Sequence, residues 1–213
     1  MAVKPVNLGV LASGRGSNLQ AIMDAIAEGR LDARVRVVVS DREEAMALER
    51  ARKAGIPAFY VNPRAYHSKE EYEKEILRLL QKHEVELVIL AGYMRLVGKV
   101  LLTAYPNRIM NIHPALLPAF PGTHGQRDAV EYGVRFSGCT VHFVDEGMDT
   151  GPIILQAVVP VEQDDTEETL AARILKEEHR IYPEAIQLFA EGRLEVRGRK
   201  VYIKPKGEEK GEE

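Results

Sequence analysis

The sequence predicts an α/β protein with a doubly wound, mostly parallel sheet and an antiparallel C-terminal part. In the first half of the chain, short apolar runs alternate with longer segments of helical period. One run, VELVILAG at 85–92, is apolar almost throughout, as is typical of a parallel strand covered on both faces. In the second half, only the short segment GMDTG separates two strand-like runs, which favours an antiparallel pair.

A strand–helix unit repeats through the first half of the chain. Ser68, with Glu71 three residues later, forms a capping-box pattern that marks a helix start. This alternation predicts a Rossmann-like arrangement, in which ligands bind beyond the carboxyl ends of the strands. The strands are expected at 6–12, 33–40, 57–61, 85–92 and 108–113, and the helices at about 18–27, 43–54, from 68 onward and at 97–104.

The pattern changes after residue 113. The loop HPALLPAFPGTHGQ contains three prolines and two glycines, which disfavours a helix through it. A long helix is expected to begin at Asp165, with Glu168 as its capping partner, and to end near Glu191. The other elements expected in this half are a helix at 126–132, strands at 137–146 and 152–161, and a terminal hairpin around residues 197–198.

Length and composition predict one domain over residues 1–204, followed by a disordered tail at 205–213. A chain of 213 residues is long enough to bury a sizeable core without disulfides. The tail is dominated by glutamate, lysine and glycine, a composition that cannot bury an apolar face.

The charge pattern and the cysteine count restrict the partners and the compartment. The formal net charge is -3 and basic residues are interspersed with acidic ones, which argues against a nucleic-acid partner. No apolar run approaches the ~20 residues of a membrane span. The single Cys139 and an N-terminus without a signal-peptide pattern predict a cytoplasmic protein. The sequence leaves both a monomer and a homodimer open.

The segment SGRGSN at 13–18 is a candidate phosphate site. It lies between the first strand and the first helix, where free backbone N–H groups and the positive end of the helix dipole favour an anion. Gly16 permits a tight turn, and Ser17 and Asn18 add donors. The alternative is a ligand-free glycine turn with a Ser or Asn cap.

Asn111 and His113 are the candidate catalytic pair. They are two residues apart at a predicted strand end, so their side chains share one face, and Asp149 could join them from a later turn. Asp149 would favour the protonated imidazolium of His113, and His113 with the Asn111 amide could then stabilise an oxyanion. Acyl-group transfer fits this set, and direct transfer is favoured because no G-x-S-x-G nucleophile elbow is present.

Each of these histidines could instead have a purely structural role. A lone histidine is often a packed or surface residue, and the roles of His124 and His142 stay open. A zinc site built from His113, His124, His142 and Asp149 lacks any H-x-x-x-H or C-x-x-C spacing, so no metal is expected.

Several segments of the chain are distinctive enough to suggest a family. They are SGRGSNLQAI near the start, AGYMRL at 91–96, NIHPALLPAFPGTHGQ at 111–126, VHFVDEGMDTGPII at 141–154 and EEHRIYP at 177–183. Together, over about residues 6–195, they resemble the phosphoribosylglycinamide formyltransferases. Related enzymes that act on methionyl-tRNA, sugar nucleotides or formyltetrahydrofolate carry similar Asn-x-His-Pro and Asp elements, but GRGSN, PGTHGQ and the compact length favour the glycinamide enzyme.

The resemblance implies a formyltransferase catalytic domain of purine (IMP) biosynthesis. In this family 10-formyltetrahydrofolate donates a formyl group to the amine of N1-(5-phospho-D-ribosyl)glycinamide, also called glycinamide ribonucleotide. The matching residues are His113, Asn111 and Asp149 for the catalytic triad, Gly16, Ser17, Asn18 and Glu178 for the ribonucleotide, and Met94, Arg95, Leu96, Val97 and Asn111 for the folate.

One position departs from the family pattern. Lys69 stands where the bacterial pattern resembles S-R-E-x-Y, with an arginine that reaches the folate glutamate tail. Lysine keeps the charge but loses the bidentate geometry, which puts the affinity for that tail in doubt. The competing functions are a formyltetrahydrofolate hydrolase, expected to carry an extra regulatory domain, a formyltransferase on another amine, and a non-catalytic mononucleotide-binding module.

Overall fold

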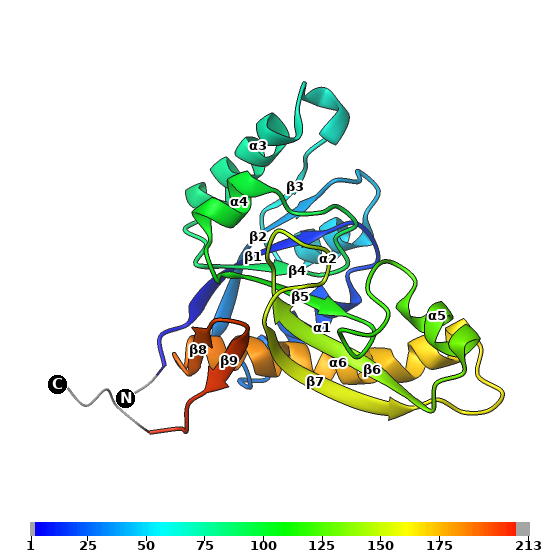
Figure 1. Ribbon diagram of the computed structural model, residues 1–213. Helices are drawn as coiled ribbons and strands as arrows, with labels where there is room; N and C mark the ends of the chain where they lie inside the picture. The colour runs from blue at the N-terminus through cyan, green and yellow to red at the C-terminus, as the bar shows by residue number, and fades with distance from the viewer. Residues whose placement is uncertain (1–2, 208–213) are drawn as a thin grey trace.

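The chain folds around one nine-stranded sheet with helices on both faces (Figure 1). The computed structural model describes residues 3–207. The strand order is β3-β2-β1-β4-β5-β6-β7-β9-β8. The strands are β1 (Val6–Ala12), β2 (Ala33–Ser40), β3 (Ala58–Tyr60), β4 (Leu87–Leu90), β5 (Ile109–His113), β6 (Phe136–Phe143), β7 (Ile153–Pro160), β8 (Leu194–Arg197) and β9 (Lys200–Ile203).

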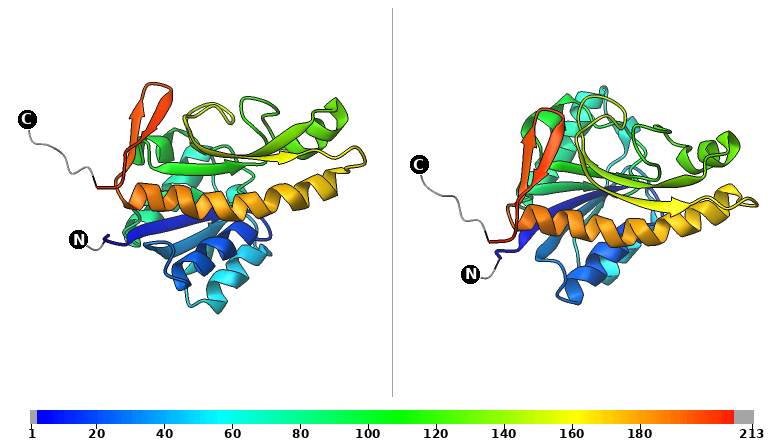
Figure 2. Two further views of the ribbon diagram at one scale, coloured as in Figure 1. Left: turned by 90° about the horizontal axis from the view of Figure 1, so that it is seen from below. Right: turned by 60° about the horizontal axis from the view of Figure 1, so that its bottom comes forward.

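The helices divide between the two faces of the sheet, as the views in Figure 2 show. Buried side chains of α1, α2, α5 and α6 join one apolar cluster, and those of α3 and α4 join a second cluster on the opposite face. The bounds are α1 (Ser17–Ala27), α2 (Met46–Lys53), a short 3-10 turn η1 (Pro63–Ala65), α3 (Lys69–Lys82), α4 (Lys99–Ala104), α5 (Gly125–Tyr132) and α6 (Glu167–Ala190).

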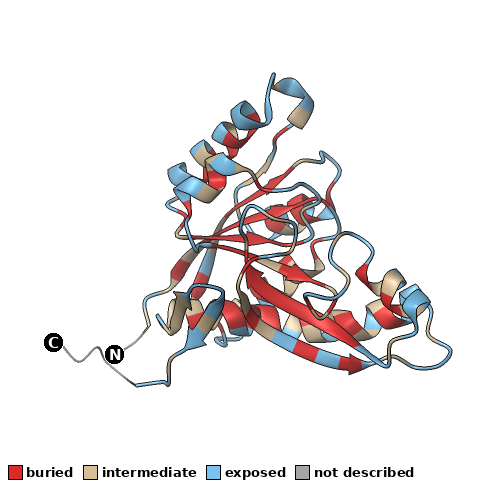
Figure 3. Cartoon of the chain, in the orientation of Figure 1, coloured by how far each residue is buried: buried red, intermediate tan, exposed pale blue. Residues whose placement is uncertain are grey.

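The predicted fold class is confirmed. Strands β1 to β5 form the parallel part of the sheet, and antiparallel pairing begins at β6. β3-β2-β1-β4-β5 are parallel, whereas β6 pairs antiparallel with both β5 and β7. Every residue of β4 is buried, since helices cover both of its faces, and Figure 3 shows burial concentrated along the central strands. In β7 buried and exposed residues alternate near its end, because α6 covers one face only.

One predicted helix cap is wrong by one position. The N-cap of α6 is Thr166, which forms a capping box with Thr169, in place of the expected Asp165 and Glu168. The Asp165 carboxylate instead accepts hydrogen bonds from the Arg173 guanidinium at 2.6 and 2.9 Å. Because this ion pair occupies Asp165, the following threonine caps the helix.

The Ser68 cap is confirmed in part. Its side chain accepts a hydrogen bond from the Glu71 N–H at 3.1 Å, but the Glu71 carboxylate binds the N–H of His67 and not that of Ser68. The predicted terminal hairpin is confirmed as β8 and β9, and β9 also pairs with β7. Residues 208–213 of the predicted tail lie outside the described residues.

The register between β5 and β6 positions the site. Asn111 pairs with His142, and His113 pairs with Thr140. Side chains of paired residues lie on the same face of a sheet, so the polar residues of both strands meet at the carboxyl end of β5. No helix in the described residues is long and apolar enough to span a membrane.

Candidate active site

Asn111 and His113 project from the last residues of β5, as their spacing predicts. His113 is buried, with 3% of its surface exposed, and Pro114 follows it where the strand ends. Nε2 of His113 lies 2.7 Å from the Phe120 carbonyl oxygen, and Nδ1 lies 3.5 Å from Oδ2 of Asp149. Both neighbours are hydrogen-bond acceptors, so each ring nitrogen of His113 faces an oxygen.

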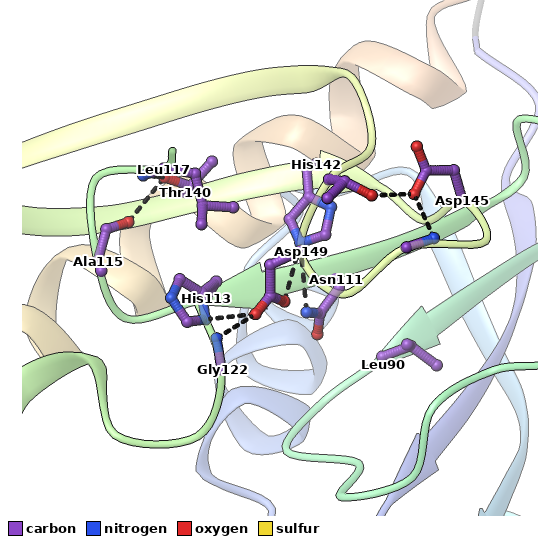
Figure 4. Close-up of polar contacts among 12 residues, drawn as sticks. Leu90, Asn111, His113, Ala115, Leu117, Gly122, Thr140, His142, Asp145 and Asp149 are labelled. Carbon is purple, nitrogen blue, oxygen red and sulfur yellow. Dashed lines mark hydrogen bonds and ion pairs between the residues drawn. The ribbon is translucent and has the colours of Figure 1, made fainter. Parts of the chain in front are cut away.

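Asp149 reaches the histidine from the loop between β6 and β7. Its backbone has a positive φ of 54°, which turns the side chain back toward β5. Oδ2 also accepts a hydrogen bond of 2.8 Å from the Gly122 N–H, so one carboxylate joins this loop to the proline-rich loop (Figure 4). The structure thus brings together the three residues predicted to form the catalytic set.

His142 completes this cluster, although its role was left open by the sequence. Its Nε2 lies 3.3 Å from Nδ2 of Asn111 and 3.8 Å from Oδ1 of Asp149. Burial lowers the pKa of His142, so its neutral form is favoured. Nδ1 lies 3.0 Å from the Phe143 carbonyl oxygen and donates to it, which leaves Nε2 to accept from the Asn111 amide.

The contact of His142 with Asn111 follows from the register between β5 and β6. His142 lies directly opposite Asn111, but the sequence does not say which residue of β6 pairs with which residue of β5. Phe120, unlike His142, was not a candidate in the sequence analysis. It lies in the proline-rich loop with a positive φ of 49°, and only the folded loop brings its carbonyl oxygen to His113.

A cavity of about 340 Å³ opens beside these residues. The predicted folate segment 94–97 lines one side of it, and Asn111, His113, His142 and Asp149 line another. Gly122, Thr123 and Gln126 from the proline-rich loop and the start of α5 add a further wall. The cavity therefore combines apolar surface from Leu90, Val97 and Val144 with the polar cluster.

The predicted phosphate loop lines a second cavity of about 370 Å³. Gly92 and Met94 line both cavities, so the two are neighbours. Gly16 has a φ of 71°, and a Cβ there would lie 2.8 Å from the Cα of Ala47, so only glycine fits. No side chain caps α1, which leaves the hydroxyl of Ser17 and the amide of Asn18 free of that role.

Glu178 lies on α6, beside the phosphate loop. It is buried, and burial raises the pKa of its carboxyl to about 7, against a smaller opposing effect from hydrogen bonding with Asn18. Oδ1 of Asn18 is itself buried and has no hydrogen-bond partner among the described residues. A buried carboxyl and a buried, unpartnered amide oxygen therefore lie next to the candidate phosphate loop.

Lys69 is not brought into the lining of either cavity. It is exposed on the first turn of α3, and its Cε lies 3.0 Å from where a Cβ on Gly98 would be, just beyond the folate segment. A ligand would have to extend out of the cavity to reach the Lys69 ammonium. Within residues 3–207, no group of three or more His, Cys, Asp or Glu side chains is arranged to hold a metal ion.

The fold and this polar cluster define a class of protein. A family model described as formyl transferase matches residues 6–186. The chain therefore belongs to the formyl transferase family.

Within this family the chain is similar to phosphoribosylglycinamide formyltransferases. It is 49% identical over 178 residues to phosphoribosylglycinamide formyltransferase of Bacillus subtilis, which covers 84% of this chain and 91% of that one. The crystal structure of glycinamide ribonucleotide transformylase 1 from Symbiobacterium toebii superimposes with a TM-score of 0.93 and 59% identity, over 94% of this chain and 95% of that one. The resemblance seen in the sequence is confirmed, and the chain groups with the phosphoribosylglycinamide formyltransferases.

A hydrolytic relative shares the same fold. A formyltetrahydrofolate deformylase from Pseudomonas syringae matches with a TM-score of 0.87 at 27% identity. The match covers 95% of this chain but 67% of the deformylase. The fold alone therefore does not separate transfer from hydrolysis.

Proposed function

We propose that this protein transfers the formyl group of 10-formyltetrahydrofolate to the amine of glycinamide ribonucleotide. The observation that carries the proposal is the position of Asn111, His113 and Asp149 on a cavity that adjoins a second cavity lined by the phosphate loop. A folate in the first cavity and a ribonucleotide phosphate in the second would bring formyl carbon and amine together beside His113. Holding two reactants in this way is a large part of catalysis.

The proposed chemistry is a direct transfer. The amine nitrogen attacks the formyl carbon, and the formyl oxygen becomes an oxyanion in a tetrahedral intermediate. The amine nitrogen then loses a proton, the folate N10 gains one, and the bond between the formyl carbon and N10 breaks. No acyl-enzyme is needed, because the substrate amine itself is the nucleophile.

In this mechanism Asn111 and His113 donate hydrogen bonds to the oxyanion. Oδ2 of Asp149 lies 3.5 Å from Nδ1 of His113, where its negative charge would orient the ring and strengthen it as a donor. Nε2 of His113 donates to the Phe120 carbonyl oxygen, so an incoming oxyanion competes with that carbonyl for the same hydrogen. Substrate binding is therefore expected to move the proline-rich loop around Phe120.

The ribonucleotide would bind at the start of α1. The N–H groups after Gly16 would hold the phosphate, with the side chains of Ser17 and Asn18 as further donors. Glu178, a buried carboxyl beside Asn18, would accept hydrogen bonds from ribose hydroxyls. The segment 94–97 would hold the pterin, and Lys69 the glutamate tail.

The second candidate function is hydrolysis of formyltetrahydrofolate, which the likeness to the deformylase favours. One experiment separates the two. Protein and 10-formyltetrahydrofolate are mixed with and without glycinamide ribonucleotide, and release of tetrahydrofolate is followed by absorbance. Release that depends on the ribonucleotide, with formylated ribonucleotide as product, supports transfer. Equal rates in both mixtures would establish hydrolysis and refute the proposal.

A further inference from the structure

The folate segment 94–97 has no helix or strand of its own, yet it must present a defined surface. Met94 and Leu96 are exposed by 58% and 48%, whereas Val97 is buried in the core cluster under α3 and α4. A short irregular segment keeps one shape only if groups around it satisfy its backbone. The residues that hold its two ends therefore decide the shape of this cavity wall.

At its C-terminal end the segment is held by a buried carboxylate. Glu73, on α3, is 3% exposed, and its two oxygens lie 2.6 and 3.0 Å from the N–H of Gly98. Burial raises the pKa of the Glu73 carboxyl, while the Gly98 hydrogen bond and the Lys69 charge oppose the effect. Burying a carboxylate costs free energy unless the group is well paired, so the hydrogen bonds from Gly98 help to offset the burial of Glu73.

The absence of a side chain at Gly98 leaves room for this contact. A Cβ at residue 98 would lie 2.5 Å from Oε2 and 2.8 Å from Oε1 of Glu73, and 3.0 Å from Cε of Lys69. Any other residue would push the carboxylate away from the backbone. The Gly98 backbone itself is extended and unstrained, so the effect of a side chain at this position would be to displace the ends of the Glu73 and Lys69 side chains.

At its N-terminal end the segment is held by Ser13. Its hydroxyl, in a residue only 2% exposed, accepts a hydrogen bond of 2.9 Å from the Met94 N–H and donates one of 2.6 Å to Asp41. The segment is therefore fixed by side-chain acceptors at both ends. Ser13 lies in the phosphate loop, and Glu73 lies on α3.

Helix α3 also contacts the segment through the residue next to Glu73. The Tyr72 hydroxyl lies 3.0 Å from the Tyr93 hydroxyl, and the Arg95 guanidinium lies over the Tyr72 ring at 5.3 Å from its centre. Lys69 is one turn earlier on the same helix. One helix therefore carries both the proposed tail contact and the anchors of the proposed pterin wall.

From these contacts we propose that Glu73 is a positioning residue for the folate co-substrate, because it holds Gly98 and so orients segment 94–97 and the Lys69 turn of α3 relative to each other. The inference rests on the proposed function of this cavity. Glu73 does not line the cavity, so it acts only through the segment that it holds.

The test is a comparison of steady-state constants for two variants that break the contact from opposite sides. Glu73→Ala removes the acceptor, and Gly98→Ala inserts a methyl group into the carboxylate. For each we expect the KM for 10-formyltetrahydrofolate to rise about 10-fold, with kcat and the KM for glycinamide ribonucleotide within about 2-fold of wild type. Glu73→Gln, which keeps the shape and one acceptor, should restore part of the affinity.

Glu70→Ala is the matched control. Glu70 is exposed on the same helix, next to Lys69. It removes one negative charge near the tail site without touching Gly98, so its KM for the folate should not rise. Circular dichroism melting of every variant separates loss of fold from loss of binding.

The outcomes are distinct. If Gly98→Ala folds and keeps the wild-type KM for the folate, the inference is overturned, whether or not Glu73→Ala folds. An equal rise of both KM values would also overturn it, because that pattern indicates general loosening. If the wild-type protein binds no 10-formyltetrahydrofolate when the two are mixed without amine, the proposed function fails and this inference falls with it.

Discussion

Nδ2 of Asn111 lies 3.3 Å from Nε2 of His142, its partner on the neighbouring antiparallel strand. His142 donates through Nδ1 to the Phe143 carbonyl oxygen, so its Nε2 is an acceptor and orients the Asn111 amide. One amide hydrogen of Asn111 is used in this contact, and the other is left for a ligand in the cavity. A buried histidine whose neutral form is favoured thus orients the amide of Asn111, a proposed catalytic residue.

Replacement of His142 tests this orientation. In His142→Phe the ring is kept but the acceptor is lost, so the Asn111 amide can rotate and kcat should fall about 10-fold. His142→Gln offers an oxygen acceptor and should retain more of the activity. The measurement is kcat for formyl transfer at saturating substrates. Wild-type kcat in His142→Phe would contradict the proposed role.

Removal of His113 tests the catalytic assignment. His113→Ala loses the proposed cationic donor, and kcat should fall by roughly 10²- to 10⁴-fold. Binding of glycinamide ribonucleotide, measured by isothermal titration calorimetry, should survive because the phosphate loop lines a separate cavity. A variant with wild-type turnover would remove His113 from the mechanism.

Asp149 is predicted to act on both the histidine and the proline-rich loop. Asp149→Ala removes the partner of His113 Nδ1 and the acceptor of the Gly122 N–H. We expect kcat to fall by about 10²-fold and hydrogen exchange of the Gly122 amide to accelerate. Glu146→Ala, an exposed change in the same loop, is the control and should alter neither quantity. Unchanged exchange at Gly122 in Asp149→Ala would argue against the link between the loops.

Glu178 predicts a pH-dependent stability. Its carboxyl is buried with a pKa of about 7, above the ordinary value of 4.5. Between these two values the folded state binds more protons than the unfolded state, so this group lowers the free energy of unfolding as pH rises through that window. Below pH 4.5 its contribution is fully present, and above about pH 7 it is lost.

Urea unfolding of wild type and Glu178→Gln at pH 5 and pH 8 measures this effect. The variant stays neutral, so its stability relative to wild type should increase between these pH values by on the order of 3 kcal/mol. A relative stability that does not change with pH would show that Glu178 has an ordinary pKa in the folded state.

Lys69 predicts weak recognition of the folate glutamate tail. Arginine offers a planar, bidentate donor pair to a carboxylate, whereas lysine offers a single point charge. Lys69→Arg should therefore lower the KM for 10-formyltetrahydrofolate by about 2- to 5-fold, and Lys69→Ala should raise it. The ribonucleotide KM serves as the internal control. If neither variant changes the folate KM, the tail does not reach α3.

Most of the fold could be predicted from local pattern. The apolar run at β4 and the alternation of strands and helices before it reflect burial on both faces of the sheet. The pattern of apolar residues along the chain shows this burial directly. Where local signals competed, the prediction was wrong by a few residues. Two adjacent residues, Asp165 and Thr166, could each cap α6, and the ion pair of Asp165 with Arg173 on that helix decided between them.

The sequence by itself determined which chemical groups the proposed site contains. Asn111 and His113 share a face because a strand has a period of two, and Gly16 opens the first helix because of its conformational freedom. Tertiary structure alone decided what surrounds these groups. The positive φ of Asp149, the pairing of His142 with Asn111 and the approach of Glu73 to Gly98 depend on segments that are distant in the chain. Such contacts follow from register and loop closure, which no local pattern encodes, and they orient the groups that the sequence supplies.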